Sequence, residues 1–371
     1  MLLPYSEKLN IGSLSRLFDN TSECYKFFWF QAILTHIKHG YTETTYEALI
    51  DEMIADAWYM VCEYHLNLGP RDNLESVVNR LRLISGMKPA EKKQNILAYL
   101  RICTDSEVIR IKRVLTQNVP YRLQAPFVES VRGRDWNVGT RQLALKINEE
   151  SNLLYRFGDI QGLNTVIHLN PDWIQYLKEN EELVDGWLQY NMIVYLQRRN
   201  PAIPGISDKL YPPQERELTK VKKYWRSLIE LQPVFDIYGQ TSLSATDISI
   251  DHFVPWSYVA HDEFWNLHPT TRSINSSKSN SLPDWDIYFP RLCNQEYTSY
   301  LAMWKYPKLH DEFEKLAKEH LNNLDVKQKI YRAGQDFSEF SGALQSVVEP
   351  VYQSALNSGF HNWIYRGEIV Q

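Results

Sequence analysis

Residues 247–257 read Asp-Ile-Ser-Ile-Asp-His-Phe-Val-Pro-Trp-Ser, and their pattern predicts the local fold. Ile248 and Ile250 alternate with polar residues, as on a half-buried strand. His252 follows Asp251 directly, so the two side chains would point to opposite faces of an extended chain. That arrangement suits an acid that binds a cation on one face and an imidazole that acts on the other.

Two further pieces follow this strand. Residues 264–267 read Phe-Trp-Asn-Leu, which places the polar Asn266 between apolar anchors. Residues 275–283 read Asn-Ser-Ser-Lys-Ser-Asn-Ser-Leu-Pro. Asn275 and Lys278 are three residues apart, so they would lie on one face of a helical turn.

Taken in order, these residues resemble the HNH, or ββα-metal, endonuclease family. The likeness is closest to the HNH domain of RNA-guided CRISPR effector nucleases. The family pattern is Asp-His-hydrophobic-hydrophobic-Pro, then Asn before an apolar residue, then Asn-x-x-Lys-x-x-x-x-Pro. In this chain the three parts are residues 251–255, residues 266–267 and residues 275–283, so the resemblance covers about fifty residues of 371.

The resemblance implies a role for each polar position. His252 would be the general base that activates water, and Asp251 and Asn275 would hold one divalent cation. Asn266 would orient His252 through the loop, and Lys278 would lie near the phosphate or the leaving oxygen. A neutral imidazole has a pKa near ~6.5 and can accept a proton at neutral pH. Oxygen ligands suit a hard cation, so Mg²⁺ (or Mn²⁺) is the expected cofactor.

The chain departs from many HNH proteins in its cysteines. Those proteins brace the ββα unit with two C-x2-C zinc pairs, whereas Cys24, Cys62, Cys103 and Cys293 are far apart here. We therefore expect no structural zinc, with apolar packing around the motif in its place. We also expect reduced, mostly buried cysteines.

Two other histidines, His261 and His268, lie in the same segment. Either could substitute for a ligand, but we expect both to be solvated loop residues.

The remaining sequence is mainly helical, so the predicted class is α+β with a small embedded ββα unit. The dense apolar stretch 22–38 indicates a buried helix, and Thr44-x-x-Glu47 is a capping-box signature for the next one. Asn200-Pro201 with the following Pro204-Gly205 indicates a linker. The predicted divisions are a helical domain 1–117, a mixed region 118–233, the nuclease unit 234–290 and a helical region 291–371.

Charge is distributed unevenly along the chain. The formal net charge is −5, and residues 236–286 contain seven acidic and two basic side chains. Residues 110–146 contain eight basic and two acidic side chains. Because a polyanion needs a local basic surface, we expect DNA to be held outside the nuclease segment. The leading candidates are Arg132, Arg134 and Arg141, followed by Lys222 and Lys223 on a basic helix that starts near Pro213; an ordinary solvated face is the alternative for both groups.

The predicted function is metal-dependent hydrolysis of phosphodiester bonds in DNA, with RNA left open as a substrate. By resemblance, the protein would be a bacterial restriction or anti-phage defence effector, acting as a homodimer or with a partner defence protein. The alternative is a non-catalytic nucleic-acid-binding or assembly module that keeps the HNH scaffold. No apolar run approaches a membrane span, and the start of the chain carries the acidic Glu7. We therefore expect a cytoplasmic protein without membrane contact.

Overall fold

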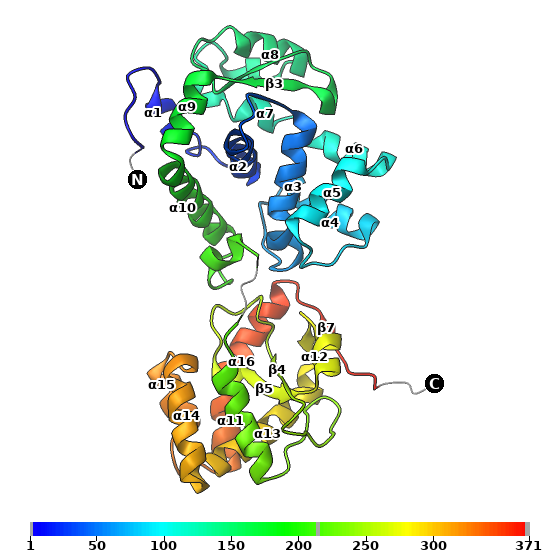
Figure 1. Cartoon of the computed structure of the whole chain (residues 1–371), viewed down its shortest axis with the longest axis vertical. Helices are drawn as coiled ribbons and strands as arrows, with labels where there is room; N and C mark the ends of the chain where they lie inside the picture. Colours follow the sequence, from blue (N-terminus) through cyan, green and yellow to red (C-terminus); the bar gives the residue numbers. More distant parts are fainter. Residues whose placement is uncertain (1–2, 213–215, 368–371) are drawn as a thin grey trace. The chain divides into compact units, whose positions relative to one another are not determined.

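The computed structural model describes residues 3–212 and 216–367, and it divides into two compact units. The N-terminal unit comprises Met1–Pro201 and Lys209–Pro212, and the C-terminal unit comprises Ala202–Asp208 and Pro213–Gln371 (Figure 1). The change of unit after Pro201 falls in the predicted linker. The boundaries predicted at 117/118, 233/234 and 290/291 lie inside these units and stay predictions about their subregions.

Helices dominate both units and the strands are short, which confirms the predicted α+β class. Among the described residues, no helix is long and apolar enough to cross a membrane. All four cysteines are free thiols, and three of them, Cys24, Cys62 and Cys293, are buried.

The N-terminal unit is built around α2, which is apolar nearly all round and is buried along most of its length. It packs against α3, α7, α9 and α10, and α3 in turn packs against α4 and α5 (Figure 1). The predicted buried helix over 22–38 is thereby confirmed. The helices of this unit are α1 (Ile11–Ser15), α2 (Tyr25–Lys38), α3 (Tyr46–Cys62), α4 (Asn73–Ser85), α5 (Lys93–Ile102), α6 (Ser106–Val114), α7 (Val119–Arg122), α8 (Thr140–Asn148), α9 (Pro171–Glu179) and α10 (Glu181–Arg199).

A three-stranded antiparallel sheet with the order β1-β3-β2 pairs one strand from the early part of this unit with two strands from its later part. Its strands are β1 (Glu43–Thr45), β2 (Tyr155–Phe157) and β3 (Val166–Leu169). The pairing explains why the predicted cap at Thr44 is wrong by one residue. Thr44 pairs with Ile167 in the sheet and is buried, so Thr45 caps α3 by accepting a hydrogen bond from the Ala48 amide.

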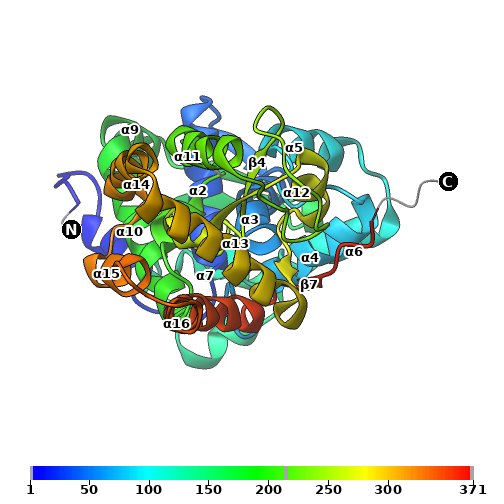
Figure 2. The ribbon, with the colours of Figure 1, turned by 90° about the horizontal axis from the view of Figure 1, so that it is seen from below.

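The C-terminal unit wraps a ββα hairpin with longer helices. Figure 2 shows α13 running between α14 and α16, and α11 packs against α14. Its helices are α11 (Thr219–Leu231), α12 (Arg272–Lys278), α13 (Trp285–Lys305), α14 (Pro307–His320), α15 (Leu324–Tyr331) and α16 (Phe337–Asn357). The predicted basic helix corresponds to α11, and Pro213 lies outside the described residues.

The hairpin consists of β4 (Ser249–His252) and β5 (Leu267–Thr270), which pair antiparallel and are followed directly by α12. This is the predicted order of two strands and a helix. The hairpin is anchored on α11, because the indole Nε1 of Trp225 donates to the Leu267 carbonyl oxygen at 3.1 Å. A separate parallel pair, β6 (Leu282–Pro283) and β7 (Asn362–Trp363), ties the end of the motif to the C-terminal segment.

Candidate functional site

Asp251 and His252 sit on β4 and face opposite sides, as the alternation of a strand requires. The Asp251 carboxylate meets Lys278 of α12, whereas the His252 imidazole meets Asp262 in the loop before β5. The strand therefore separates two polar networks that begin at neighbouring residues. This confirms the opposite-face geometry expected from the sequence.

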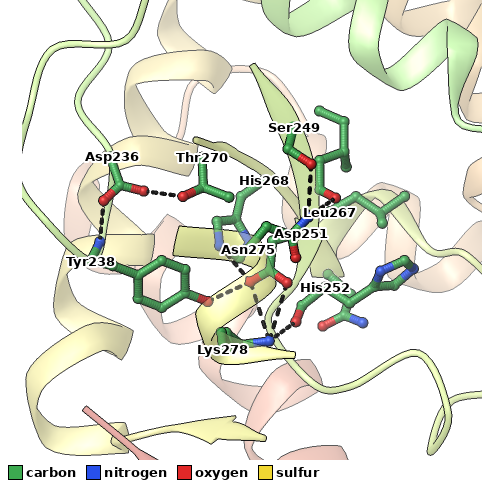
Figure 3. A network of polar contacts seen from close by, with 12 residues as sticks. Asp236, Tyr238, Ser249, Asp251, His252, Leu267, His268, Thr270, Asn275 and Lys278 are labelled. Atoms are coloured by element: carbon green, nitrogen blue, oxygen red, sulfur yellow. Dashed lines mark hydrogen bonds and ion pairs between the residues drawn. The ribbon is translucent and has the colours of Figure 1, made fainter. Parts of the chain in front are cut away.

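The Asp251 carboxylate is almost completely enclosed by donors (Figure 3). The Lys278 ammonium lies 3.2 Å from each of its oxygens and donates to the His252 carbonyl oxygen at 2.7 Å. The Tyr238 hydroxyl donates to Oδ2 at 2.7 Å. Burial lowers the pKa of Lys278, and the neighbouring Asp251 carboxylate opposes that shift. Asp251 is thus fixed in one orientation by two side chains from different elements.

Tyr238 is positioned by a tight loop centred on the buried Asp236. The Asp236 carboxylate accepts from the backbone amide of Tyr238 at 3.0 Å, from the amide of Gly239, and from the Thr270 hydroxyl at 2.6 Å. Burial raises the pKa of Asp236, and these hydrogen bonds oppose the shift. Arg291 of α13 donates to the Tyr238 carbonyl oxygen at 3.1 Å. The loop therefore links β5 and α13 to the Asp251 carboxylate.

His252 belongs to a second network. Its Nε2 lies 2.7 Å from Oδ1 of Asp262, and the Arg216 guanidinium pairs with the same carboxylate. Burial lowers the pKa of His252, while the hydrogen bond and charge of Asp262 oppose the shift. Burial alone would raise the pKa of Asp262, but contacts with His252 and Arg216 lower it. In the neutral tautomer with Nε2–H donating to Asp262, Nδ1 carries the free lone pair.

The two asparagines of the motif both bind backbone. Asn266 accepts from the Val254 amide at 2.7 Å and donates to the Val254 carbonyl oxygen at 2.9 Å, so it clamps the loop just after His252. Asn275 donates through Nδ2 to the Ile250 carbonyl oxygen at 3.0 Å and to the Ser249 hydroxyl at 2.8 Å. Its amide nitrogen therefore fixes α12 to β4 and leaves the amide oxygen as a donor atom for a cation.

His268 differs from the sequence expectation, while His261 is exposed as expected. His268 lies in β5 directly across from Asp251, and its side chain is 0% exposed. The expected solvated loop position is therefore wrong for His268, because the strand register turns its ring inward. Burial lowers the pKa of His268 to about 4.

The predicted nucleic-acid contacts are divided between the two units. Arg132, Arg134 and Arg141 are exposed side chains of the N-terminal unit. Lys222 and Lys223 lie on α11 of the C-terminal unit, which also holds the ββα hairpin. Lys223 is largely exposed and lies 3.5 Å from a carboxylate oxygen of Glu312.

Three residues of the site lie outside the sequence motif and could not be predicted from its spacing: Tyr238, Asp262 and Arg216. Tyr238 contacts Asp251 from 13 residues away and Asp262 contacts His252 from 10 residues away, while Arg216 pairs with Asp262 from 46 residues away. The only available signal was the run of acids in this segment, which includes Asp262.

The donor set can be tested against a divalent cation. Within residues 3–212 and 216–367, no group of three or more His, Cys, Asp and Glu side chains could hold a metal ion. Figure 3 shows Asn275 beside Asp251, and its amide oxygen is a type of ligand that such a grouping omits. The buried ring nitrogens of His268 make no hydrogen bond. A carboxylate, an amide oxygen and an imidazole without a hydrogen bond are ligand types that fit a divalent cation.

Comparison with known proteins identifies the segment. Residues 236–284 match the model of a family described as HNH endonuclease, and no curated protein or solved structure matches the chain. The match begins at the loop that positions Tyr238 and includes all five polar motif residues. The special likeness to the CRISPR effectors stays a prediction. The family resemblance itself is confirmed: this chain contains a domain of the HNH endonuclease family, at residues 236–284.

Proposed function

We propose that this protein is a metal-dependent endonuclease that hydrolyses phosphodiester bonds in DNA. The observation that carries the proposal is the separation of two networks by β4 within the HNH domain. One network fixes the carboxylate of Asp251 beside Asn275 of α12, and the other fixes the imidazole of His252. Cation binding and proton transfer are thus assigned to adjacent residues that do not compete for the same partners.

The His252 imidazole acts as the general base. With Nε2–H donating to Asp262, Nδ1 takes a proton from the water whose oxygen attacks phosphorus, and the bond to the leaving oxygen breaks. Asp262 fixes the tautomer and stabilises the imidazolium that forms, as a carboxylate behind a catalytic histidine does. Asn266 keeps the loop after His252 in place through its two bonds to Val254.

Asp251 and Asn275 hold the cation, Mg²⁺ or Mn²⁺. When bound, that ion supplies Lewis-acid stabilisation of the charge on the leaving oxygen. Lys278 compensates the charge of Asp251. By the family resemblance, its ammonium is proposed to act near the scissile phosphate or the leaving oxygen. The hydrogen bonds of Asn275 to β4 support its part, because they fix the residue while leaving its oxygen available.

DNA is proposed as the substrate, with the exposed Arg132, Arg134 and Arg141 and the α11 residues Lys222 and Lys223 as phosphate contacts. The acidic nuclease segment would attract a polyanion poorly on its own, which supports a role for basic side chains elsewhere. From the family resemblance we also propose a role as a restriction or anti-phage effector. The protein would act alone, as a homodimer or with a partner protein.

A plasmid-nicking assay tests the proposal. The wild-type protein should convert supercoiled DNA to the nicked form with Mg²⁺ or Mn²⁺, and EDTA should stop this cleavage. His252→Ala should cleave roughly 10²–10⁴-fold more slowly, the usual effect of a lost acid–base group, while DNA binding persists. The matched control is His261→Ala, because His261 is an exposed histidine of the same segment.

Two outcomes would contradict this function. If His252→Ala cleaves as fast as wild type, the base is elsewhere. If wild type binds DNA but cleaves neither DNA nor RNA with any divalent cation, the chain is a binding module that keeps the HNH scaffold.

A further inference from the structure

We propose that His268 is a third ligand of the cation, through Nε2, beside Asp251 and Asn275. This inference rests on the proposed metal-dependent function and specifies which ions that site prefers. It starts from an unusual burial: the ring is 0% exposed, and neither Nδ1 nor Nε2 makes a hydrogen bond. Both nitrogens are strongly polar, so enclosing them without partners costs free energy that an aliphatic residue would not incur.

Within the part of the chain that the structure describes, aromatic rings pack around His268 and no hydrogen bond to its ring nitrogens is formed. The Tyr238 ring packs edge-on with its centroid 5.5 Å away, but its hydroxyl is already committed to Asp251. The Phe253 ring lies at 6.2 Å and carries no polar atom. Among the ion pairs of the described residues, His268 has one, between its Nε2 and Oδ2 of Asp251 at 3.5 Å.

The distance between these two atoms matches that of two ligands on one ion. Nitrogen and oxygen ligands bind divalent transition ions at about 2.0–2.2 Å, so neighbouring ligands on one ion are roughly 3–3.6 Å apart. Asp251 and His268 are direct cross-strand partners, and cross-strand partners project to the same face of a hairpin. Figure 3 shows both side chains on the face of the hairpin where Asn275 and Lys278 lie.

An imidazole in the ligand set changes the preferred ion. Mg²⁺ strongly prefers oxygen ligands, whereas first-row transition ions such as Mn²⁺ and Co²⁺ also accept an imidazole nitrogen beside carboxylate and amide oxygens. With His268 as a ligand, the site should bind Mn²⁺ and Co²⁺ more tightly than Mg²⁺. Replacing His268 should lower the affinity for the transition ions far more than the affinity for Mg²⁺.

The direct experiment detects the nitrogen–metal bond without changing His268. The full chain carrying His252→Ala, which removes the other nearby imidazole, is loaded with Mn²⁺ and studied by pulsed electron paramagnetic resonance. Coupling to a coordinated imidazole nitrogen is expected, and it should vanish in the double variant His252→Ala/His268→Gln. A bound Mn²⁺ without nitrogen coupling in the first protein would overturn the inference.

Titration calorimetry in the same background gives the second readout. His268→Gln should weaken Mn²⁺ binding by at least 10-fold and leave Mg²⁺ binding within a few-fold. The matched control is His36→Gln, since His36 of the N-terminal unit also has a ring nitrogen without a hydrogen-bond partner. It should bind both ions like the parent.

The outcomes separate this inference from the proposed function. If Asp251→Asn abolishes Mn²⁺ binding while His268→Gln does not alter it, only the role of His268 is wrong. If the His252→Ala parent binds no divalent cation and wild type nicks DNA in EDTA, the metal-dependent function itself is wrong, and the role of His268 falls with it.

Discussion

At the scale of single residues, the site around Asp251 depends on buried charges that compensate one another. Lys278 is 1% exposed and carries the only ammonium placed against the enclosed Asp251 carboxylate among the ion pairs of the described chain. Such a pair adds little net stability over apolar packing, but removing one partner leaves an uncompensated buried charge. The proposed role of Asp251 in holding a cation is therefore coupled to its role in stabilising the fold.

Lys278→Met should accordingly lower the free energy of unfolding by about 3–5 kcal/mol, because the methionine fills the space but leaves Asp251 unpaired. The double variant Asp251→Asn/Lys278→Met should recover much of that loss. Denaturant unfolding of the three proteins measures both effects. A single variant as stable as wild type would show that the ion pair has no structural importance.

Asp262 provides a test of how His252 is oriented. Asp262→Ala removes the acceptor of the Nε2 hydrogen bond, so kcat for nicking should fall on the order of 10²-fold while KM for DNA changes little. Asp262→Asn keeps an oxygen acceptor and should be milder. Rates of plasmid nicking against DNA concentration separate kcat from KM; a change confined to KM would place Asp262 in substrate binding instead.

The motif residues could be predicted from the sequence because short-range spacing fixes them on one hairpin and one helical turn. Tyr238 and Arg216 could not, since their contacts depend on how a distant loop and segment close over the hairpin. His268 was misplaced for a different reason. The residue that follows it is a proline, which obscured the second strand, and only the pairing with Asp251 turns the ring inward.

At the scale of elements, long apolar helices such as α2 were predictable, whereas their ends depended on tertiary pairing. The start of α3 moved from Thr44 to Thr45 because β1 uses Thr44 in the sheet. The contact between α3 and α5 was likewise invisible in the sequence. There Lys93, at the start of α5, pairs with both Asp56 and Glu52 of α3.

This ion cluster predicts a pH dependence of stability. Burial raises the pKa of Asp56 to about 6, and Lys93 opposes the shift only in part. Because the folded pKa exceeds the unfolded value of about 3.9, the stabilising contribution is complete below that value and is lost as pH rises through about 6. Asp56→Asn stays neutral, so it should gain up to about 3 kcal/mol relative to wild type between pH 4 and pH 7.

Denaturant unfolding at a series of pH values measures this difference. Lys93→Met is a second variant to compare, because it leaves the carboxylates of Asp56 and Glu52 without their ammonium partner. Its free energy of unfolding should fall more steeply than that of wild type between pH 4 and pH 7. Parallel pH curves for wild type and Asp56→Asn would mean that Asp56 is ionised in the folded protein throughout that range.

At the scale of the whole molecule, the chain forms two compact units, and the HNH domain lies in the C-terminal one. The sequence indicated the linker near Pro201, because proline and glycine interrupt the helical pattern there, but it gave no sign that α11 belongs with the nuclease hairpin. That assignment depends on the contact of Trp225 with β5, which joins residues 42 positions apart. Basic side chains proposed to hold DNA therefore lie both on the nuclease unit and on the unit that lacks it.

The salt dependence of DNA binding can assign these surfaces. Each lost phosphate contact in duplex DNA lowers the log–log salt slope by roughly 0.9, so replacing Arg132, Arg134 and Arg141 with alanine should flatten the slope by up to about 2.7. The control replaces Lys88, Lys92 and Lys178, which are also exposed on the N-terminal unit and change the net charge equally.

Fluorescence anisotropy with a labelled duplex, repeated at several salt concentrations, measures the slope for each protein in EDTA. If the arginine variant and the lysine control behave alike, net charge alone explains the effect and the N-terminal unit makes no specific phosphate contacts. In that case Lys222→Ala/Lys223→Ala should flatten the slope instead, because α11 carries these two residues on the same unit as the HNH domain. A flattened slope in the arginine variant alone would mean that the N-terminal unit binds the DNA, whereas the HNH domain proposed to cleave it lies in the C-terminal unit.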